Sequence, residues 1–356
     1  MQQREHSQAP AQNSQSKCPS PKHADVEKTH IQMGYLPLLD SIALLWADHR
    51  GYFKAQGLDV TLVKEASWSS LRDRLAYGFL DAAHCLSAML PAAAAGHDQL
   101  GIALQTGLIL SHNQAYISLS QAHCHRFKIS RNDRPQQSAS KILQAMQQGQ
   151  SFHFAHVFEH SIHHYCLRHW LALADPQQAK AIKLLTSPPA LMVDGMAQQV
   201  FDGFCVGEPW NIQSQLQGYS HVIAASHDIM PQVADKVLAV TQNWAESHPL
   251  SLAAISTAIQ QAQQELNQLS DLGEVWDLLK RSHIVRFECS SQIHVQHFHH
   301  LEQIIRNMVS DCTPKLDDFV WLIQQMQRWD DLSLTADQVN RMAAACIVKI
   351  PTSETA

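Results

Sequence analysis

The sequence lacks the features that define several large classes of protein. No run of apolar residues approaches the roughly 20 that a membrane-spanning helix requires. Lysine and arginine together number 26 against 32 aspartates and glutamates, and they form no basic stripe. Since contact with nucleic-acid phosphates needs concentrated positive charge, we expect no direct binding of DNA or RNA. Any effect of this protein on a nucleic acid would require a partner protein.

Cysteine is scarce and scattered. The chain has eight cysteines and no Cys-x-x-Cys pair, which argues against a disulfide framework and against a zinc site. Reduced and mostly buried thiols are therefore expected. No Ser-His-Asp constellation, pair of carboxylates or glycine-rich phosphate loop stands out in the sequence either. The sequence thus predicts neither an enzyme nor a bound cofactor.

Histidine, in contrast, is abundant, with 23 residues distributed over the chain. Two groups have a spacing that can place imidazoles on one helical face, namely His160, His163 and His164, and His294, His297 and His300. Neither group is accompanied by cysteine or by a His-Glu-x-x-His pattern. We therefore expect no bound metal ion.

The first 30 residues are rich in glutamine, serine, proline and charged side chains. They contain no apolar segment of the length that an export signal requires, and no apolar stretch precedes Cys18 that would allow lipid attachment. Their composition is typical of disordered segments. We therefore expect residues 1–30 to form a disordered tail and the protein to be cytoplasmic.

Beyond this tail, predicted strands alternate with predicted helices. Asp40 or Ser41 is expected to cap the first helix. Such alternation is typical of parallel βαβ units. Strands are expected at residues 31–36, 60–63, 81–85 and 102–109 in the first half, and at 152–158, 182–186 and 204–207 in the second.

The alternation is interrupted once. The basic and polar segment 121–137 is interpreted as the crossing into a second lobe, and the segment 236–241 as the strand that returns to the first. Everything after Trp244 is predicted to be helical. We therefore predict an α/β protein with two doubly wound lobes. Their predicted bounds are 31–117 with 238–350 for the first lobe and its C-terminal helices, and 118–237 for the second.

The most informative segment is residues 64–84, KEASWSSLRDRLAYGFLDAAH. The apolar run 60–63 before it predicts a buried strand, Ser67 and Ser69 are candidate N-caps, and Gly78 is expected to end the helix. Trp68 would then lie where a strand passes into a helix. Because open α/β sheets bind ligands at the carboxyl ends of their strands, Trp68 is a candidate wall of a ligand site.

Three motifs carry a resemblance to known proteins, and they follow in matching order: KEASW, DAAH and FCVGEPWN. From about residue 31 to about residue 249 the chain resembles the nitrate- and bicarbonate-binding proteins of ABC transporters. It is similar also to the cytoplasmic nitrate/nitrite sensors of assimilatory operons, the NasS-type sensors. The resemblance implies a bilobal periplasmic-binding-protein-like (type II) fold, with the ligand held in a cleft between the lobes.

The resemblance also implies which residues contact the anion. His160 or His164 could take the place of His163, because residues 159–162 do not match the family's pattern before its histidine. The ligand-binding residues carried over from the matching motifs are Trp68 of KEASW, Gln114 of SHNQAYISLS, His163 of HSIHHYCLRHWL, Glu208 of GEPW and Lys236 of ADKVLAV.

Nitrate is a small planar anion with three weak acceptor oxygens, so its site needs several converging donors and apolar walls. Trp68 would donate its indole N–H. Glu208 is an unsuitable partner for an anion, and it is interpreted either as orienting Lys236 or as capping the helix that begins near Trp210. If His163 takes up a proton on binding, the affinity should fall as the pH rises.

The implied function is that of a cytosolic nitrate/nitrite sensor. A change in the angle between the lobes would release or capture an RNA-binding transcription antiterminator. One alternative is the substrate-binding component of a nitrate or bicarbonate ABC transporter. Another is a thiamine-pyrimidine-synthase-like enzyme, which shares the fold but carries a cysteine-rich iron motif.

The helix predicted at residues 316–328 has a second possible role. Its apolar side chains either form the docking face for the partner or pack on the first lobe. The side chains concerned are Phe319, Trp321, Leu322 and Met326.

Overall fold

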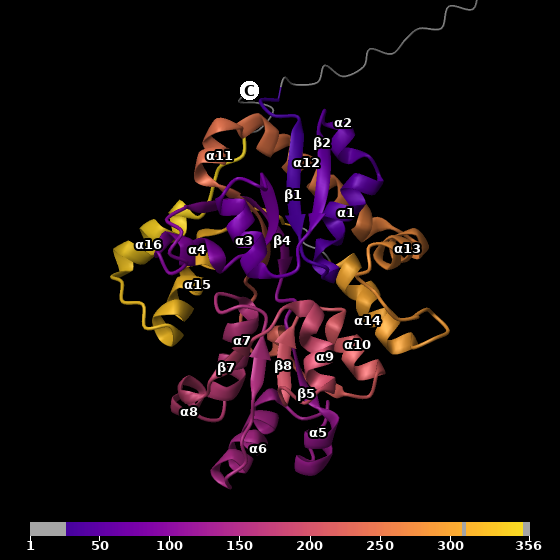
Figure 1. The fold of residues 1–356 in the computed structure, drawn as a ribbon, viewed down its shortest axis with the longest axis vertical. Coiled ribbons are helices and arrows are strands. Elements are labelled where there is room, and N and C mark those ends of the chain that lie inside the picture. The colour runs from indigo at the N-terminus through magenta and orange to yellow at the C-terminus, as the bar shows by residue number, and fades with distance from the viewer. Residues whose placement is uncertain (1–25, 308–310, 352–356) are drawn as a thin grey trace, which may run out of the picture.

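A computed structural model describes residues 26–307 and 311–351 of the chain. This part forms two α/β lobes, one above the other in Figure 1, each built on a five-stranded sheet. The first sheet has the order β2-β1-β3-β10-β4 and consists of β1 (His30–Tyr35), β2 (Asp59–Lys64), β3 (Ala82–Leu86), β4 (Leu104–His112) and β10 (Ala234–Thr241). The second has the order β7-β6-β8-β5-β9 and consists of β5 (Tyr116–Ser120), β6 (Phe154–His156), β7 (Leu184–Thr186), β8 (Gly203–Val206) and β9 (Ser220–Ala225).

Helices cover both sheets. Those of the first lobe are the short 3-10 helix η1 (Leu39–Ser41), α1 (Ile42–His49), α2 (Tyr52–Ala55), α3 (Trp68–Ala76) and α4 (Met89–Ala94). Those of the second are α5 (Gln121–Phe127), α6 (Pro135–Gln147), α7 (Ile162–Ala172), α8 (Pro176–Ala181), η2 (Pro189–Leu191), α9 (Met192–Ala197), α10 (Trp210–Leu216) and η3 (Ser226–Asp228). The C-terminal helices are α11 (Gln242–Ser247), α12 (Pro249–Gln268), α13 (Gly273–Arg281), α14 (Val295–Arg306), α15 (Leu316–Trp329) and α16 (Ala336–Ala345). None of the helices in the described ranges is long and apolar enough to cross a membrane.

The predicted α/β architecture with two lobes is confirmed, but its sheets are mixed rather than parallel. Strands β2, β1 and β3 run parallel, as do β7, β6 and β8. β10 runs antiparallel to β3 and β4, and β5 runs antiparallel to β8 and β9. Both exceptions are the first strand after the chain changes lobe, because a chain that enters from the other lobe approaches the sheet from the opposite end.

The chain changes lobe through two short crossings, residues 113–115 and 226–233. Asn113 joins them: its side-chain amide donates to the carbonyl of Pro231 at 2.8 Å and accepts from the N–H of Val233 at 2.8 Å. The predicted lobe bounds therefore need correction, because they cut through β5 and β10. The segment 121–137 is also no crossing, since it forms α5 and the start of α6 within the second lobe.

The segment around Trp68 follows the predicted plan with one exception. Ser67 is the N-cap of α3 and accepts from the N–H of Ser70 at 3.1 Å, and Gly78 follows the helix with a positive φ of 75°. Trp68 is the first residue of the helix. The preceding strand β2 is half-exposed rather than buried, because it is the edge strand of its sheet.

Residues 1–25 of the expected disordered tail lie outside the described residues. The expected tail is nevertheless too long at its C-terminal end, because residues 26–30 belong to the folded first lobe. Lys28 pairs with Asp81 at 2.6 Å, and Glu27 accepts from the backbone N–H groups of Leu250 and Ser251 at the start of α12.

The C-terminal helices contact both lobes, on opposite sides of the junction in Figure 1. In α15, Trp321 stacks on His169 of the second lobe with ring centroids 5.8 Å apart. Tyr165 of the second lobe donates to Asp330 at 3.2 Å. In α14, the ring of His300 packs edge-on against Tyr116, with centroids 5.2 Å apart. Helix α15 is therefore not packed on the first lobe alone. Its side chains Phe319, Leu322 and Met326 are fully buried and form no free docking face.

Candidate functional site

A completely buried lysine lies at the end of the first sheet that faces the second lobe. The ammonium of Lys236, in β10, lies 2.6 Å from a carboxylate oxygen of Asp235 and 3.1 Å from one of Asp40. Burial acts to lower the pKa of Lys236, but the two carboxylates outweigh it and raise the pKa above its ordinary value. Burial likewise acts to raise the pKa of Asp40, but Lys236 and His84 lower it. The three groups form a buried ion cluster with one positive and two negative charges.

The two carboxylates have further partners that hold them in place. Asp40 accepts from Nε2 of His84 at 3.0 Å and from the hydroxyl of Ser111 at 3.2 Å. Asp235 accepts from the backbone N–H of Gln114 at 2.9 Å. Because a carboxylate only accepts, the bond to Asp40 assigns a proton to Nε2 of His84. Of the two predicted caps, Asp40 or Ser41, it is Ser41 that stands at the N-cap of α1, although its side chain makes no capping bond there, and Asp40 points instead at Lys236.

Two aromatic side chains beside this cluster carry unused polar groups. The Lys236 ammonium lies 5.9 Å from the ring centre of Trp68. The indole nitrogen of Trp68 is buried and has no hydrogen-bond partner among the described residues. Neither ring nitrogen of His163, at the start of α7, has one there either. Nδ1 of His84 likewise has no partner among the described residues. Buried polar groups without partners are rare and costly, so these nitrogens beside Lys236 indicate a ligand.

His163 is neutral when the site is unoccupied. Burial, and secondly the charge of Lys236, lower its pKa to about 3, against the opposing influence of Asp235 and Asp40. A neutral imidazole offers one N–H donor and one acceptor. The surroundings of Gly207 show that His163 lies at the lobe junction. A Cβ atom added to Gly207 would lie 3.8 Å from Nε2 of His163 and 3.4 Å from the side chain of Leu38 in the first lobe. His163 and Trp68 therefore face the junction from different lobes.

The alternatives to His163 lie against the C-terminal helices. Nδ1 of His160 is 3.9 Å and Nε2 of His164 is 3.7 Å from the carboxylate of Asp330, which follows α15. Burial is the largest cause of the lowered pKa of both histidines. Of the three candidate histidines, it is His163 whose pKa is influenced by the charges of Lys236, Asp235 and Asp40.

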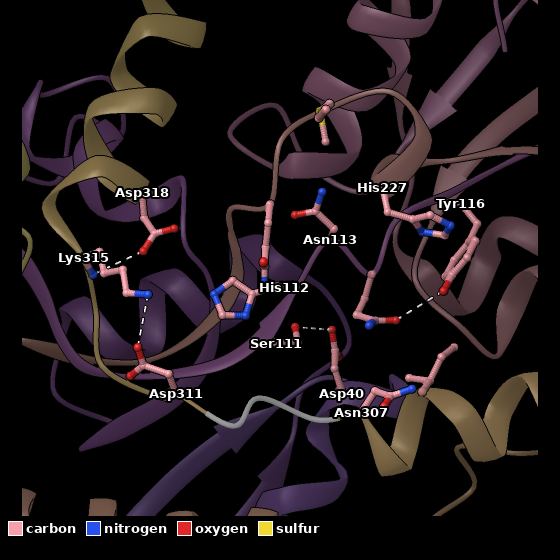
Figure 2. A pocket seen from close by; sticks show the side chains of 14 residues that line it. Asp40, Ser111, His112, Asn113, Tyr116, His227, Asn307, Asp311, Lys315 and Asp318 are labelled. Carbon is pink, nitrogen blue, oxygen red and sulfur yellow. Dashed lines mark hydrogen bonds and ion pairs between the residues drawn. The ribbon is translucent and has the colours of Figure 1, made fainter.

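Gln114 reaches the cluster with its backbone only. Its side chain carbonyl accepts from the hydroxyl of Tyr116 at 3.4 Å and lines a pocket of about 510 Å³. Figure 2 shows this pocket, with Asp40 and Ser111 at one wall and Lys315 at another. Asp40 thus separates the pocket from Lys236.

Glu208 is also not among the partners of Lys236. Its carboxylate accepts from the N–H of Ile212 at 3.1 Å and so caps α10, which agrees with one of the two predicted interpretations. Its other oxygen lies 3.5 Å from Nε2 of His300 in α14. The second predicted interpretation, that Glu208 orients Lys236, is not supported. Asp40 and Asp235 hold the ammonium of Lys236 instead.

Asp40, Asp235 and His84 were not predicted as site residues from the sequence. His84 ends the DAAH motif, which was noticed only as part of the resemblance. Asp235 precedes Lys236 in one strand, where neighbouring side chains normally point to opposite faces. The register of β10 against β4 shifts between Ala234 and Lys236, and such irregularities re-aim side chains. Only the folded strand shows that both charges meet.

Two lobes with a buried polar site at their junction define the class of bilobal ligand-binding proteins. The chain belongs to the NMT1-like family, whose sequence model matches residues 24–279. It is 28% identical over 344 residues to the bicarbonate transport ATP-binding protein CmpC of Synechocystis sp., covering 91% of this chain and 50% of CmpC. It is 31% identical over 266 residues to the nitrate/nitrite binding protein NrtA of Nostoc sp., covering 72% of this chain and 58% of NrtA. The chain thus spans about half the length of these curated relatives.

Solved structures show the same fold. The periplasmic nitrate-binding protein NrtA from Synechocystis PCC 6803 superimposes with a TM-score of 0.76 at 21% identity, covering 90% of this chain and 86% of NrtA. The alkanesulfonate-binding protein SsuA from Xanthomonas axonopodis pv. citri does so with a TM-score of 0.65 at 15% identity, covering 90% and 98%. The predicted periplasmic-binding-protein fold is confirmed. In the described residues, no three His, Cys, Asp or Glu side chains are placed to hold a metal ion.

Proposed function

We propose that this protein binds nitrate or nitrite between its lobes and acts as a cytoplasmic sensor. In this proposal, ligand binding releases an RNA-binding transcription antiterminator of nitrate assimilation from a complex with the sensor. The observation that carries the binding step is the set of ring nitrogens on Trp68 and His163, beside the buried Lys236, for which the described part of the chain offers no hydrogen-bond partner. A relative named as a nitrate/nitrite binding protein supports the choice of ligand.

The donor groups of this site are of the kind that a small planar oxyanion requires. A hydrogen bond to a charged group contributes about 1.5–3 kcal/mol. Several such bonds, reduced by the cost of ordering the ligand, approach the roughly 8 kcal/mol of micromolar binding. Because Trp68 belongs to the first lobe and His163 to the second, an anion bonded to both favours the closed arrangement. A ligand shifts a conformational equilibrium only through such a difference in affinity.

The C-terminal helices provide a route from lobe angle to partner binding. Helix α15 and the Asp330 that follows it touch α7, the helix that carries His163. Helix α14 touches Tyr116 and Glu208 on the other side of the junction. Opening of the lobes would have to break or move these contacts. The surface that a partner meets would therefore differ between the two arrangements.

We expect the purified protein to capture the antiterminator in the absence of nitrate and to release it when nitrate saturates the site. A pull-down with the antiterminator immobilised, with and without nitrate or nitrite, measures this. Chloride at equal ionic strength is the control for screening. Capture that is identical in nitrate and chloride, from a protein that binds nitrate in calorimetry, would refute the sensor role while leaving the binding role intact.

The donor role of Trp68 has a separate test. Trp68→Phe keeps an aromatic ring but removes the N–H, and we expect it to weaken nitrate binding by about 1.5–3 kcal/mol, roughly tenfold to a hundredfold. Calorimetry measures the affinity, and thermal unfolding of the unliganded protein checks the fold. The matched control is Trp276→Phe in α13, which removes another buried indole N–H that has no partner within residues 26–307 and 311–351. Equal affinities in the two variants would contradict the assignment.

A second candidate is the substrate-binding component of a nitrate or bicarbonate transporter. The observation that favours it is the similarity to CmpC, which extends over 91% of the chain and so beyond the residues of the family model. Calorimetry with bicarbonate in place of nitrate, and co-purification with a membrane permease, distinguish this candidate from the sensor. The enzyme alternative lacks support, because in the described ranges the cysteines are buried and no three Cys, His, Asp or Glu side chains are placed to hold a metal ion.

A further inference from the structure

The buried ion cluster is electrically unbalanced before any ligand enters. Asp235 and Lys236 are fully buried and Asp40 is 3% exposed, so solvent screens none of the three charges well. Leaving aside His84, which lies 3.0 Å from Asp40, the ammonium and the two carboxylates carry a net charge of one negative unit. A bound anion would add a second uncompensated negative charge to the same buried region. Buried charges without compensation are strongly disfavoured, so an anion site of this composition needs a further positive charge.

His163 is the group that can supply this charge. The charged and titratable side chains that act on it are Lys236 and Asp235 from β10, Asp40 from η1 and His156 from β6. His156 is committed elsewhere, since its Nδ1 lies 2.7 Å from the carbonyl of Phe158. Both nitrogens of His163 are unpartnered among the described residues. In the unoccupied site it is neutral, with a pKa of about 3 caused first by burial and then by Lys236.

We propose that a monoanion enters this site together with one proton, which His163 takes up, and that Asp40 and Asp235 thereby select monoanions against dianions. This inference rests on the proposed function, since it concerns the same site. The anion contributes one negative charge and the proton one positive charge, so the net charge of the cluster stays unchanged. A dianion such as sulfate would leave one charge uncompensated and is rejected.

The proton also improves the hydrogen bonding. A neutral imidazole donates through one nitrogen, whereas an imidazolium donates through both. An oxyanion that has only acceptor oxygens, such as nitrate, gains from the second donor. The nearby anion raises the pKa of His163 in the complex, because an adjacent opposite charge favours the protonated form. The substrate class is therefore singly charged oxyanions, and their affinity depends on pH.

The sign of this dependence follows from the proton uptake. Consider a pH between the pKa of His163 in the free protein and its higher pKa in the complex. In this pH range the complex holds one proton more than the free protein. Affinity for nitrate then falls as the pH rises, approaching a tenfold loss per pH unit above the bound-state pKa. Nitrate itself does not titrate in this range, so the change belongs to the protein.

The experiment is calorimetry of nitrate binding at pH 6.5 in two buffers of different ionisation enthalpy, MES and imidazole. We expect the apparent heats to differ by an amount that corresponds to uptake of a large part of one proton. His163→Asn, which keeps a donor but does not titrate, should abolish the difference. Sulfate should give no binding heat with the wild-type protein.

Asp235→Asn tests the role of the carboxylates. It retains an oxygen that can accept from the N–H of Gln114 and removes one negative charge. We expect it to bind nitrate at least tenfold more tightly than the wild type at pH 8, with a weaker pH dependence, and to gain measurable binding of sulfate. Melting of the unliganded variant shows whether it is folded.

The outcomes separate this inference from the proposed function. If nitrate binds the wild-type protein with the same heat in both buffers, or if sulfate binds as tightly as nitrate, the inference is overturned and the binding function stands. If no oxyanion binds in either buffer, the binding function itself fails, and the inference with it. The wild-type measurement decides the matter even where a variant does not fold.

Discussion

Replacing Lys236 by methionine should lower the free energy of unfolding by about 3–5 kcal/mol, the usual cost of removing one partner from a buried ion pair. The substitution leaves Asp40 and Asp235 facing each other in the interior without the ammonium that holds both, at 3.1 and 2.6 Å. Methionine fills most of the volume of lysine, so the loss reflects charge rather than a cavity. Urea denaturation of the unliganded protein at neutral pH measures it.

The control is an ion pair of equal length on the surface. Lys180 lies 2.5 Å from Asp331, but both side chains are largely exposed, at 47% and 82%. Lys180→Met should therefore cost no more than about 1 kcal/mol. Equal stabilities of the two variants would show that the cluster around Lys236 is not charged as described. A large loss also means that a Lys236 variant is no clean test of ligand binding, because its unliganded fold is weakened.

Acidification from pH 7 to pH 5 should destabilise the unliganded protein by at least about 4 kcal/mol, because burial also lowers the pKa of His164 and so adds to the effect of three other histidines. Burial lowers the pKa of His156 and His160 to about 4 and that of His163 to about 3. The unfolded chain, with histidines near their ordinary pKa of about 6.5, binds more protons than the folded protein in this range. The stability is therefore present above pH 6.5 and is lost as the pH falls toward 4, by about 2 kcal/mol for each histidine at pH 5.

Two carboxylates, Asp330 and Asp48, oppose this trend, because burial raises the pKa of both. Burial raises the pKa of Asp330 to about 6, so the folded protein binds its proton first and gains stability on acidification, by about 1–2 kcal/mol at pH 5. The buried histidines outweigh the two carboxylates. Urea denaturation at several pH values gives the slope of unfolding free energy against pH.

Matched histidine variants identify the source of the slope. His160→Gln removes one titrating group from the interior and should make the slope smaller. His30→Gln removes a histidine whose side chain is 81% exposed and should leave the slope unchanged. A wild-type protein that is equally stable at pH 7 and pH 5 would contradict the assignment of these histidines as neutral and buried.

The helical pattern around Trp68 was predictable because it depends on local chemistry. A serine at the N-cap, apolar side chains at helical spacing and a glycine after the last turn act within a few residues of one another. The same holds for the alternation of strands and helices that indicates two α/β lobes. The antiparallel entry of β5 and β10 was not predictable, because strand direction depends on how two distant crossings run between the lobes.

The residues of the candidate site also fall into two groups, those that short motifs predicted and those that only the folded structure reveals. Trp68, His163 and Lys236 were recognisable from motifs, and the structure places all three at the junction. Asp40 was predicted, as an alternative to Ser41, to cap a helix, because its neighbours in sequence suggest that role. Its partner Lys236 lies almost 200 residues further along the chain.

The sequence by itself determined the α/β class, the two-lobed plan and the residues with unusual polar groups, since periodicity and short motifs act over a few neighbouring residues. The tertiary structure alone decided which charges face each other. Burial and strand register bring Asp40, Asp235 and Lys236 into one buried cluster beside His163. Electrostatic energies depend on distance and on exclusion of water, and neither is written in the order of residues.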